Sequence, residues 1–117
     1  MTLADARSIL VTLRPAIADF VAVRADLAEL EVDLATWGTS PLGALADAKG
    51  WQARLHSELE RFASAGAEVK GYAPLLLDFP GERDGVPVLW CWLEGDADID
   101  WYHGADAGFA GRRPVQP

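Results

Sequence analysis

The sequence has little cysteine and no long apolar run, and each shortage excludes a class of protein. Cys91 is the only cysteine among 117 residues, so the chain alone closes no disulfide and forms no zinc knuckle or CxxC redox pair. The longest apolar run, residues 86–93, is far shorter than the roughly 20 residues of a membrane-spanning helix. Residues 1–7 have neither the basic start nor the apolar stretch of a signal peptide. These features predict a cytoplasmic protein.

Positive charge is also scarce. Ten Lys and Arg residues against eighteen Asp and Glu residues give a formal net charge of -8. A chain of this sign repels phosphate backbones and anionic lipid headgroups, so neither nucleic acid nor a membrane is an expected partner. The sequence also lacks the GxxxxGKS/T, GxGxxG, GxSxG and HExxH motifs. Nucleotide hydrolysis, Rossmann redox chemistry, ordinary serine hydrolysis and zincin proteolysis are therefore unsupported.

The first part of the chain has the spacing of two amphipathic helices. Apolar residues recur three and four apart over residues 3–37, with charged residues between them. Pro15 interrupts this stretch, and because the apolar register continues on both sides we expect a kink rather than a break. Ser40 followed by Pro41 predicts the cap and first residue of a second helix, which should end at Gly66. The short connection predicts an antiparallel hairpin.

After this hairpin the pattern changes from helical to extended. Residues 75–79, 86–93 and 99–103 have the composition of strands. Arg83-Asp84-Gly85 predicts the turn of a β-hairpin between the first two of them. Residues 105–117, which contain glycine and proline, predict a tail without regular structure.

These elements predict a single α+β domain over residues 1–117. We expect a long antiparallel helical hairpin over 1–66, then a small three-stranded antiparallel sheet and an irregular C-terminal tail over 67–117. The first helix would be about 50 Å long, whereas a compact domain of this size has a diameter of about 35 Å. One hairpin would leave apolar surface uncovered, so we expect a homodimer with a four-helix arrangement. The alternative is a monomer whose leader helix folds back over the sheet.

Aromatic residues are concentrated in the second and third predicted strands. Trp90, Trp92 and Trp101 lie there, close to His103. If paired residue numbers in these two strands sum to an odd number, Trp90 and Trp92 share a face with Trp101 and His103, whereas an even sum places Cys91 on that face. We favour the odd register because it matches the bulkier faces of both strands. The aromatic residues would then be core, or would line a pocket for a small-molecule ligand or cofactor.

His103 is the first candidate for chemistry. An imidazole at the mouth of a sheet can ligate a metal, bind haem iron or act as a general base, or it can serve the structure alone as a hydrogen-bonding group. Its candidate companions are Cys91, Asp78, Glu94 and Asp106, whose spacing matches no zinc or catalytic template. The metal ligands would be His103, Cys91 and Asp78, with iron, zinc or haem as the cofactor.

An acidic turn precedes the third predicted strand. Asp96, Asp98 and Asp100 match the first three oxygen positions of a calcium loop. Trp101 and Ala107 stand where that loop requires Gly and Glu, so we interpret the segment as a solvated turn.

Two arginines provide the only positive pair in the last third of the chain. Arg112 and Arg113 can hold a carboxylate or phosphate, or they can pair with the acidic residues of 71–117. The candidate ligand-binding residues are therefore Trp90, Trp92, Trp101, His103, Asp106, Arg112 and Arg113.

Five separated motifs occur in order after residue 72. They are Leu76-Leu77-Asp78-Phe79-Pro80, Arg83-Asp84-Gly85, Cys91-Trp92, Trp101-Tyr102-His103 and Ala107-Gly108-Phe109-Ala110-Gly111-Arg112-Arg113-Pro114. Together with a leader helix that contains proline, they resemble the signature of an uncharacterised bacterial family catalogued as domain of unknown function 2203. The resemblance spans nearly the whole chain and implies no established activity. It implies a shortlist of motif positions: Asp78, Arg83, Cys91, Trp92, His103, Asp106, Arg112 and Arg113.

Two functions from different classes follow from the sequence. The first is a small cytoplasmic binding or assembly protein that dimerises through its helical hairpin and presents an aromatic pocket containing His103. The second is a metal-binding or haem-binding protein, or an enzyme, that uses His103 with Cys91 or Asp78. A second polar side chain within about 3 Å of His103 would favour the second function.

Overall fold

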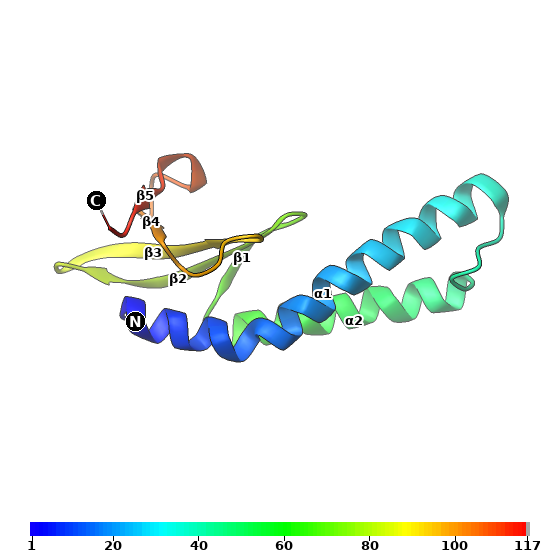
Figure 1. Ribbon diagram of the computed structural model, residues 1–117, viewed down its shortest axis with the longest axis horizontal. Coiled ribbons are helices and arrows are strands. Elements are labelled where there is room, and N and C mark those ends of the chain that lie inside the picture. The colour runs from blue at the N-terminus through cyan, green and yellow to red at the C-terminus, as the bar shows by residue number, and fades with distance from the viewer. Residues whose placement is uncertain (117) are drawn as a thin grey trace. The chain divides into compact units, whose positions relative to one another are not determined.

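Two helices followed by five strands make up the described part of the chain, residues 1–116 of a computed structural model (Figure 1). The elements are α1 (Leu3–Trp37), α2 (Leu45–Ser64), β1 (Glu68–Tyr72), β2 (Leu75–Arg83), β3 (Val86–Leu93), β4 (Trp101–His103), a 3₁₀ turn η1 (Phe109–Gly111) and β5 (Arg113–Pro114). The class is therefore α+β, as predicted. No helix within residues 1–116 combines the length and apolar character needed to cross a membrane.

The chain divides into two compact units. One unit combines residues 1–13 with residues 62–117, and the other contains residues 14–61. The division falls within α1, beside Pro15. The helix nevertheless runs without a break from Leu3 to Trp37, so Pro15 does not split it into two helices.

The unit of residues 14–61 is the helical hairpin that the sequence predicts. Its buried apolar cluster joins α1 to α2 through Leu27, Leu30 and Ala48. Polar pairs between the helices lie at the surface of the hairpin, where Arg54 forms an ion pair with Asp19. The partly buried side chains around the cluster are Leu34, Leu42, Trp51 and Leu55.

The predicted start of the second helix is wrong. α2 begins at Leu45 rather than at Pro41. The Ser40 hydroxyl does not cap a helix: it donates a hydrogen bond to Asp33 Oδ2 at 2.6 Å and accepts one from the Leu42 N–H at 3.1 Å. Asp47 accepts the Ala44 N–H at 2.8 Å, at the start of the helix itself. A side chain three residues further along therefore satisfies this helix terminus.

The sheet has five antiparallel strands in the order β1-β2-β3-β4-β5 rather than the three that were predicted. The predicted strands correspond to β2, β3 and β4, whereas β1 and β5 were missed, and part of the predicted tail is ordered as η1 and β5. Residue 117 of that tail lies outside the described residues. The turn between β2 and β3 is confirmed, because Asp84 and Gly85 both have positive φ, 53° and 79°, as a two-residue hairpin turn requires.

The register between β3 and β4 is the even one, so the favoured odd register is wrong. Leu89 pairs with His103 and Cys91 pairs with Trp101. Cys91 therefore shares a face with Trp101 and His103, and Trp90 lies on the opposite face beside Tyr102, at a ring-centroid separation of 6.1 Å. The physical reason is that contacts far apart in sequence, rather than the matching of bulky strand faces, decide the register.

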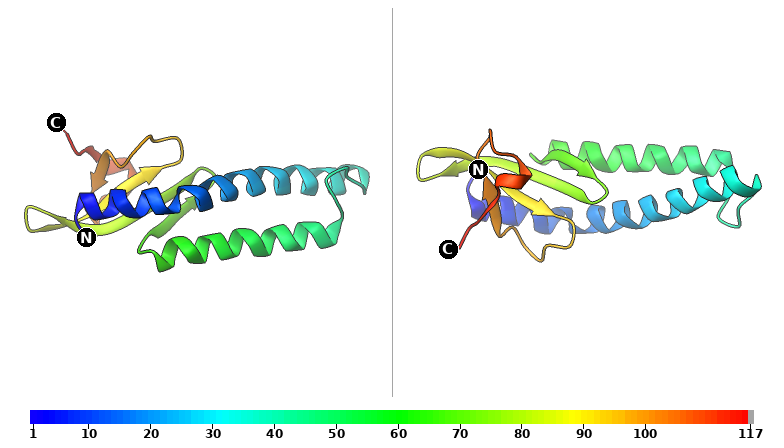
Figure 2. Two further views of the ribbon diagram at one scale, coloured as in Figure 1. Left: turned by 60° about the horizontal axis from the view of Figure 1, so that its bottom comes forward. Right: turned by 90° about the horizontal axis from the view of Figure 1, so that it is seen from above.

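Different segments of the chain pack on the two faces of the sheet (Figures 1 and 2). The first turns of α1 lie along one face, where Trp90 Nε1 donates a hydrogen bond to the Met1 carbonyl at 3.1 Å. The buried sheet residues of this face are Leu75, Leu77, Phe79, Val88, Trp90 and Trp92. The C-terminal segment crosses the other face, where Arg112 stacks on Trp101 with 4.6 Å between guanidinium carbon and ring centroid. The buried polar residues of the sheet, Asp78 and His103, are on this second face.

Candidate metal centre

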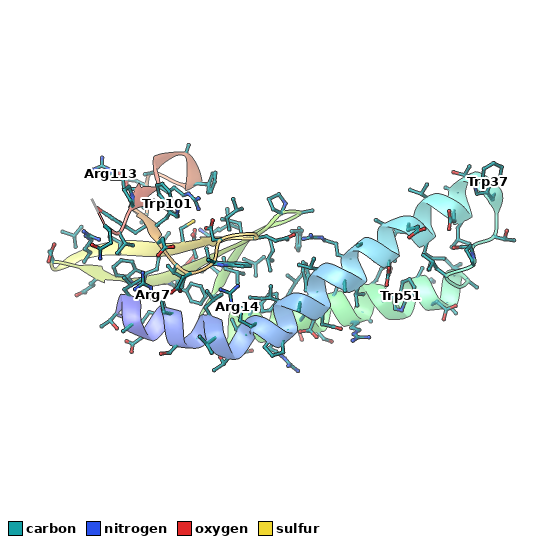
Figure 3. All side chains as sticks on the ribbon, in the orientation of Figure 1. Arg7, Arg14, Trp37, Trp51, Trp101 and Arg113 are labelled. Carbon is teal, nitrogen blue, oxygen red and sulfur yellow. The ribbon has the colours of Figure 1, made fainter. Side chains whose placement is uncertain are left out.

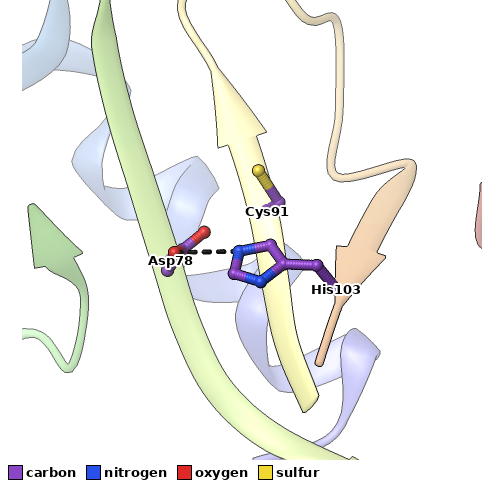
Figure 4. A group of neighbouring side chains, drawn as sticks. All are labelled: Asp78, Cys91 and His103. Carbon is purple, nitrogen blue, oxygen red and sulfur yellow. Dashed lines mark hydrogen bonds and ion pairs between the residues drawn. The ribbon is translucent and has the colours of Figure 1, made fainter. Parts of the chain in front are cut away.

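Three adjacent strands bring Asp78, Cys91 and His103 together on the face of the sheet beneath the C-terminal segment (Figure 4). Asp78 on β2 pairs directly with Cys91 on β3, and His103 comes from β4. Their exposed fractions are 2%, 0% and 3%. Each offers one potential ligand atom, and these three atoms all lie within 4.8 Å of one another. The sequence proposed these three residues as metal ligands, and the structure places them side by side.

Each ring nitrogen of His103 forms a hydrogen bond with an oxygen atom. Nδ1 lies 2.8 Å from the Gly104 carbonyl oxygen, and Nε2 lies 3.0 Å from Asp78 Oδ2. A carbonyl only accepts, so Nδ1 carries hydrogen and donates. The contact to Asp78 then needs a second proton, held on Nε2 as an imidazolium or on the carboxyl group. The pair therefore keeps one proton between Nε2 and Oδ2, at the position where a cation would bind both atoms.

The second oxygen of Asp78 is a buried acceptor with an unused hydrogen-bonding capacity. Oδ1 accepts no hydrogen bond from the residues that the structure describes. Lys70 on β1 lies 3.8 Å from Oδ2 and 3.5 Å from Glu68, so its charge is shared between two carboxylates. Buried polar atoms are nearly always satisfied in folded proteins, and exceptions often mark an ion or a water molecule.

Cys91 has the properties of a structural or metal-binding thiol rather than a nucleophile. Burial raises its pKa to about 11, and the nearby Arg112 guanidinium only partly opposes this effect. The thiol is therefore protonated at neutral pH, whereas nucleophilic cysteines need a lowered pKa. Acyl transfer through Cys91 is not favoured by this environment, while a metal ion can displace the proton and bind the sulfur.

Arg112 covers the sulfur side of the cluster. Its Nη1 lies 3.9 Å from Cys91 Sγ and 3.3 Å from Asp96 Oδ2. The guanidinium also lies over two rings, at 4.6 Å from the Trp101 centroid and 4.7 Å from the Phe109 centroid. Cation–π contacts of this kind orient the planar group. Arg112 is therefore fixed beside the three candidate ligands.

The other predicted ligand-binding residues lie elsewhere. Trp90 and Trp92 point to the α1 side of the sheet, so they do not share a face with Trp101 and His103. Asp106 and Arg113 line a separate cleft of about 320 Å³ that also touches His103. The remaining lining residues of that cleft are Val86, Pro87, Val88, Tyr102, Gly104, Ala107 and Gly111. Figure 3 shows Trp101 and Arg113 on the tail side of the sheet.

Sequence reasoning missed two neighbours of the centre, Lys70 and Asp96. Lys70 lies on β1, a strand that was not predicted, and Asp96 was interpreted as part of a solvated turn. One signal did exist for the Asp78 contact with Cys91. A two-residue turn at Asp84 and Gly85 fixes the pairing along the whole hairpin, and this pairing places Asp78 opposite Cys91.

Comparison with known proteins gives a family and no function. A family model described as an uncharacterized conserved protein (DUF2203) matches residues 1–115, which confirms the resemblance carried by the five motifs. No curated protein matches the chain, and no solved structure matches it.

Proposed function

Because the chain belongs to the DUF2203 family, whose description assigns no activity, we propose its function from the buried face of the sheet: it is a metal-binding protein. Asp78, Cys91 and His103 hold a divalent transition-metal ion, with zinc as the first candidate. The observation that carries this proposal is the convergence of a carboxylate, a thiol and an imidazole within 4.8 Å in a buried place. A buried cluster of titratable groups of these three types is a recognised sign of a functional site.

The donor set supports zinc or a similar ion. Thiolate and imidazole ligands favour Zn²⁺ and its transition-metal neighbours, whereas Ca²⁺ and Mg²⁺ prefer oxygen. Haem is less well supported, because both ring nitrogens of His103 already face oxygen atoms at 3.0 Å or less. A tetrahedral Zn²⁺ holds its ligand atoms about 3.5 Å apart, so side-chain shifts of about 1 Å would close the site.

The surroundings of the ligands also support binding. The Gly104 carbonyl accepts the His103 Nδ1–H at 2.8 Å, which leaves Nε2 directed toward Asp78 and Cys91. A backbone acceptor of this kind usually fixes the tautomer and orientation of a metal-ligating histidine. Asp78 Oδ1, which accepts no hydrogen bond within the described chain, gives the carboxylate a further free donor atom for an ion.

The test is metal binding by the full chain, purified without a histidine tag. We expect about one zinc ion per chain by mass spectrometry, and a thiolate-to-cobalt absorption band when Co²⁺ is added to metal-free protein. Cys91→Ser and His103→Gln should abolish the band. His56→Gln is the matched control, since His56 is exposed on α2 and pairs with Glu60 at 3.1 Å. A wild-type protein that gives no band, or a Cys91→Ser variant that binds as well as wild type, contradicts the proposal.

A second candidate function is assembly through the helical hairpin. It is supported by two large apolar side chains of the unit of residues 14–61, since Trp37 is 76% exposed and Leu45 is 63% exposed. Figure 3 shows Trp37 at the end of α1. Apolar surface of this kind marks an interaction site where it is contiguous. We propose that a second copy of the chain covers them. Sedimentation equilibrium at micromolar concentration should show a dimer that Trp37→Gln weakens, and a monomeric wild-type protein contradicts this candidate.

A further inference from the structure

Arg112 stands where an additional ligand of the metal centre would arrive. We propose that the bound metal keeps one coordination position for a small planar oxyanion, of the carboxylate or bicarbonate type, and that Arg112 binds this anion. The inference rests on the metal centre proposed above and adds to it a ligand class and a residue that recognises the ligand. Three features support it: the number of protein ligands, the positive groups around them, and the exposure of Arg112.

The described part of the chain supplies three ligands, and a tetrahedral ion needs four. The cluster contains no fourth His, Cys, Asp or Glu within residues 1–116. The nearest further carboxylate on the sulfur side, Asp96, is occupied: its Oδ2 accepts the Leu93 N–H at 3.0 Å and contacts Arg112 at 3.3 Å. Zinc sites with three protein ligands generally leave the fourth position to water or substrate. With one ligand atom from each of the three residues, the fourth ligand is exogenous.

Two positive side chains flank the centre, and each also pairs with a carboxylate beside it, Lys70 with Glu68 and Arg112 with Asp96. Arg112 lies 3.9 Å from the sulfur of Cys91, and Lys70 lies 3.8 Å from the carboxylate of Asp78. A cationic ligand would meet both positive groups, whereas an oxyanion can bind the metal and a guanidinium together. Arginine suits this task because its planar fork matches two oxygens of a carboxylate.

The donors of Arg112 are still available. Only Nη1 has partners among the described residues, and Nε and Nη2 donate to none of them. Stacking on Trp101 and Phe109 fixes the plane of the guanidinium without using its N–H groups. A side chain held in this way has already lost much of its rotamer entropy, so it is preorganised and binding a ligand costs little further ordering.

Arg112 is also more exposed to solvent than the three candidate ligands. The three candidate ligands are at most 3% exposed, whereas the side chains of Arg112 and Asp96 are 16% and 21% exposed. A molecule that approaches Cys91 from this side therefore meets the guanidinium first. This position selects for negative charge before the ligand reaches the metal.

The experiment uses the full chain loaded with Co²⁺, whose visible absorption reports the coordination of the ion. Acetate and bicarbonate are titrated separately. Chloride, a single-atom anion without the two oxygens that a guanidinium binds, is the control anion. We expect a saturable spectral shift with one or both planar anions. The anion that produces the shift identifies the ligand as a carboxylate or as bicarbonate. Arg112→Met should weaken this binding roughly tenfold to a hundredfold, as the loss of a charge-assisted hydrogen bond predicts. Arg112→Lys should weaken it less, and it serves if Arg112→Met does not fold.

The matched control is Arg61→Met, which removes the same charge from an exposed residue of α2 outside the centre. It should leave anion binding unchanged. A thiolate-to-cobalt band that forms but does not respond to either planar anion overturns the inference and leaves the metal centre standing. Equal weakening by Arg112→Met and Arg61→Met, or an equal response to chloride, also overturns it. The complete absence of the band overturns both proposals.

Discussion

Removal of the Asp78 carboxylate leaves His103 without its partner in a place that water does not reach. Both side chains are 3% exposed, and Nε2 and Oδ2 lie 3.0 Å apart. Truncating one partner of a buried hydrogen-bonded pair costs about 1–3 kcal/mol when the other group is left neutral and about 3–5 kcal/mol when it is left charged. We therefore expect Asp78→Ala to lower the free energy of unfolding of the sheet unit, the unit that contains the five strands, by an amount within this range. Asp78→Asn should cost about 1 kcal/mol, because an amide N–H can donate to Nε2 while Nδ1 still donates to Gly104.

The assay is urea unfolding of metal-free protein, so that the loss of a bound ion does not add to the difference. Tryptophan fluorescence is followed in a Trp37→Phe, Trp51→Phe background, because the other three tryptophans lie in the sheet unit. The dependence of free energy on urea should be the same in all variants. An Asp78→Ala protein within about 1 kcal/mol of its parent, which is less than one unpaired buried group costs, would refute the reasoning. An equal loss of free energy of unfolding in Asp78→Asn and Asp78→Ala would refute it as well.

Three further predictions concern single residues. Burial raises the pKa of Cys91 to about 11, so Cys91 is a thiolate in roughly one molecule in a thousand at pH 8. A thiol reagent should therefore label the native protein slowly and the urea-unfolded protein at once. Rapid labelling of the native protein contradicts this prediction. Burial also raises the pKa of Glu58 above its ordinary value of 4.5, with the Asp19 charge adding to the effect and the Arg61 charge opposing it. The stabilising contribution of Glu58 is then complete below pH 4.5 and is lost as the pH rises through the raised pKa. The Glu58→Gln variant should therefore have a higher melting temperature than wild type at pH 7 but not at pH 4. The same difference in melting temperature at both pH values contradicts the raised pKa. Gly81→Ala should cost about 1–3 kcal/mol, because its Cβ would overlap the Met1 carbonyl and Trp90 Nε1; an unchanged melting temperature contradicts the packing.

The sequence predicted the β2–β3 hairpin because local chemistry decides it. Asp84 and Gly85 have the residue types that adopt positive φ, and a two-residue turn fixes every pair along the two strands. The contact between Asp78 and Cys91 follows from this turn alone. For the same reason, this half of the candidate site could be predicted without any knowledge of distant contacts.

The β3–β4 register could not be predicted in this way. The connection over residues 94–100 is long, and both faces of each strand carry bulky or polar groups, so the period-two pattern does not distinguish the registers. The deciding contacts are distant in sequence: His103 with Asp78, and Trp90 with Met1. These contacts place Cys91 beside His103 and overturn the expected aromatic pairing.

β1 was missed because its composition is weak for a strand. It contains Glu, Lys and Gly, which are depleted in strands, and it forms through pairing with β2. The start of α2 was misplaced because Ser40 and Pro41 have the local signature of a helix start, while the Ser40 hydroxyl is bound to Asp33. Dimerisation through the hairpin stays a prediction.

The two outer margins of the sheet are poor templates for another polypeptide. On β1 the register is irregular between Val69 and Gly71, and such an irregularity twists the strand and interrupts its row of free peptide groups. On the opposite margin β5 is two residues long and ends in Pro114, whose nitrogen has no hydrogen to donate. These two margins therefore present only short and interrupted rows of free peptide groups to a neighbouring molecule in a crowded solution.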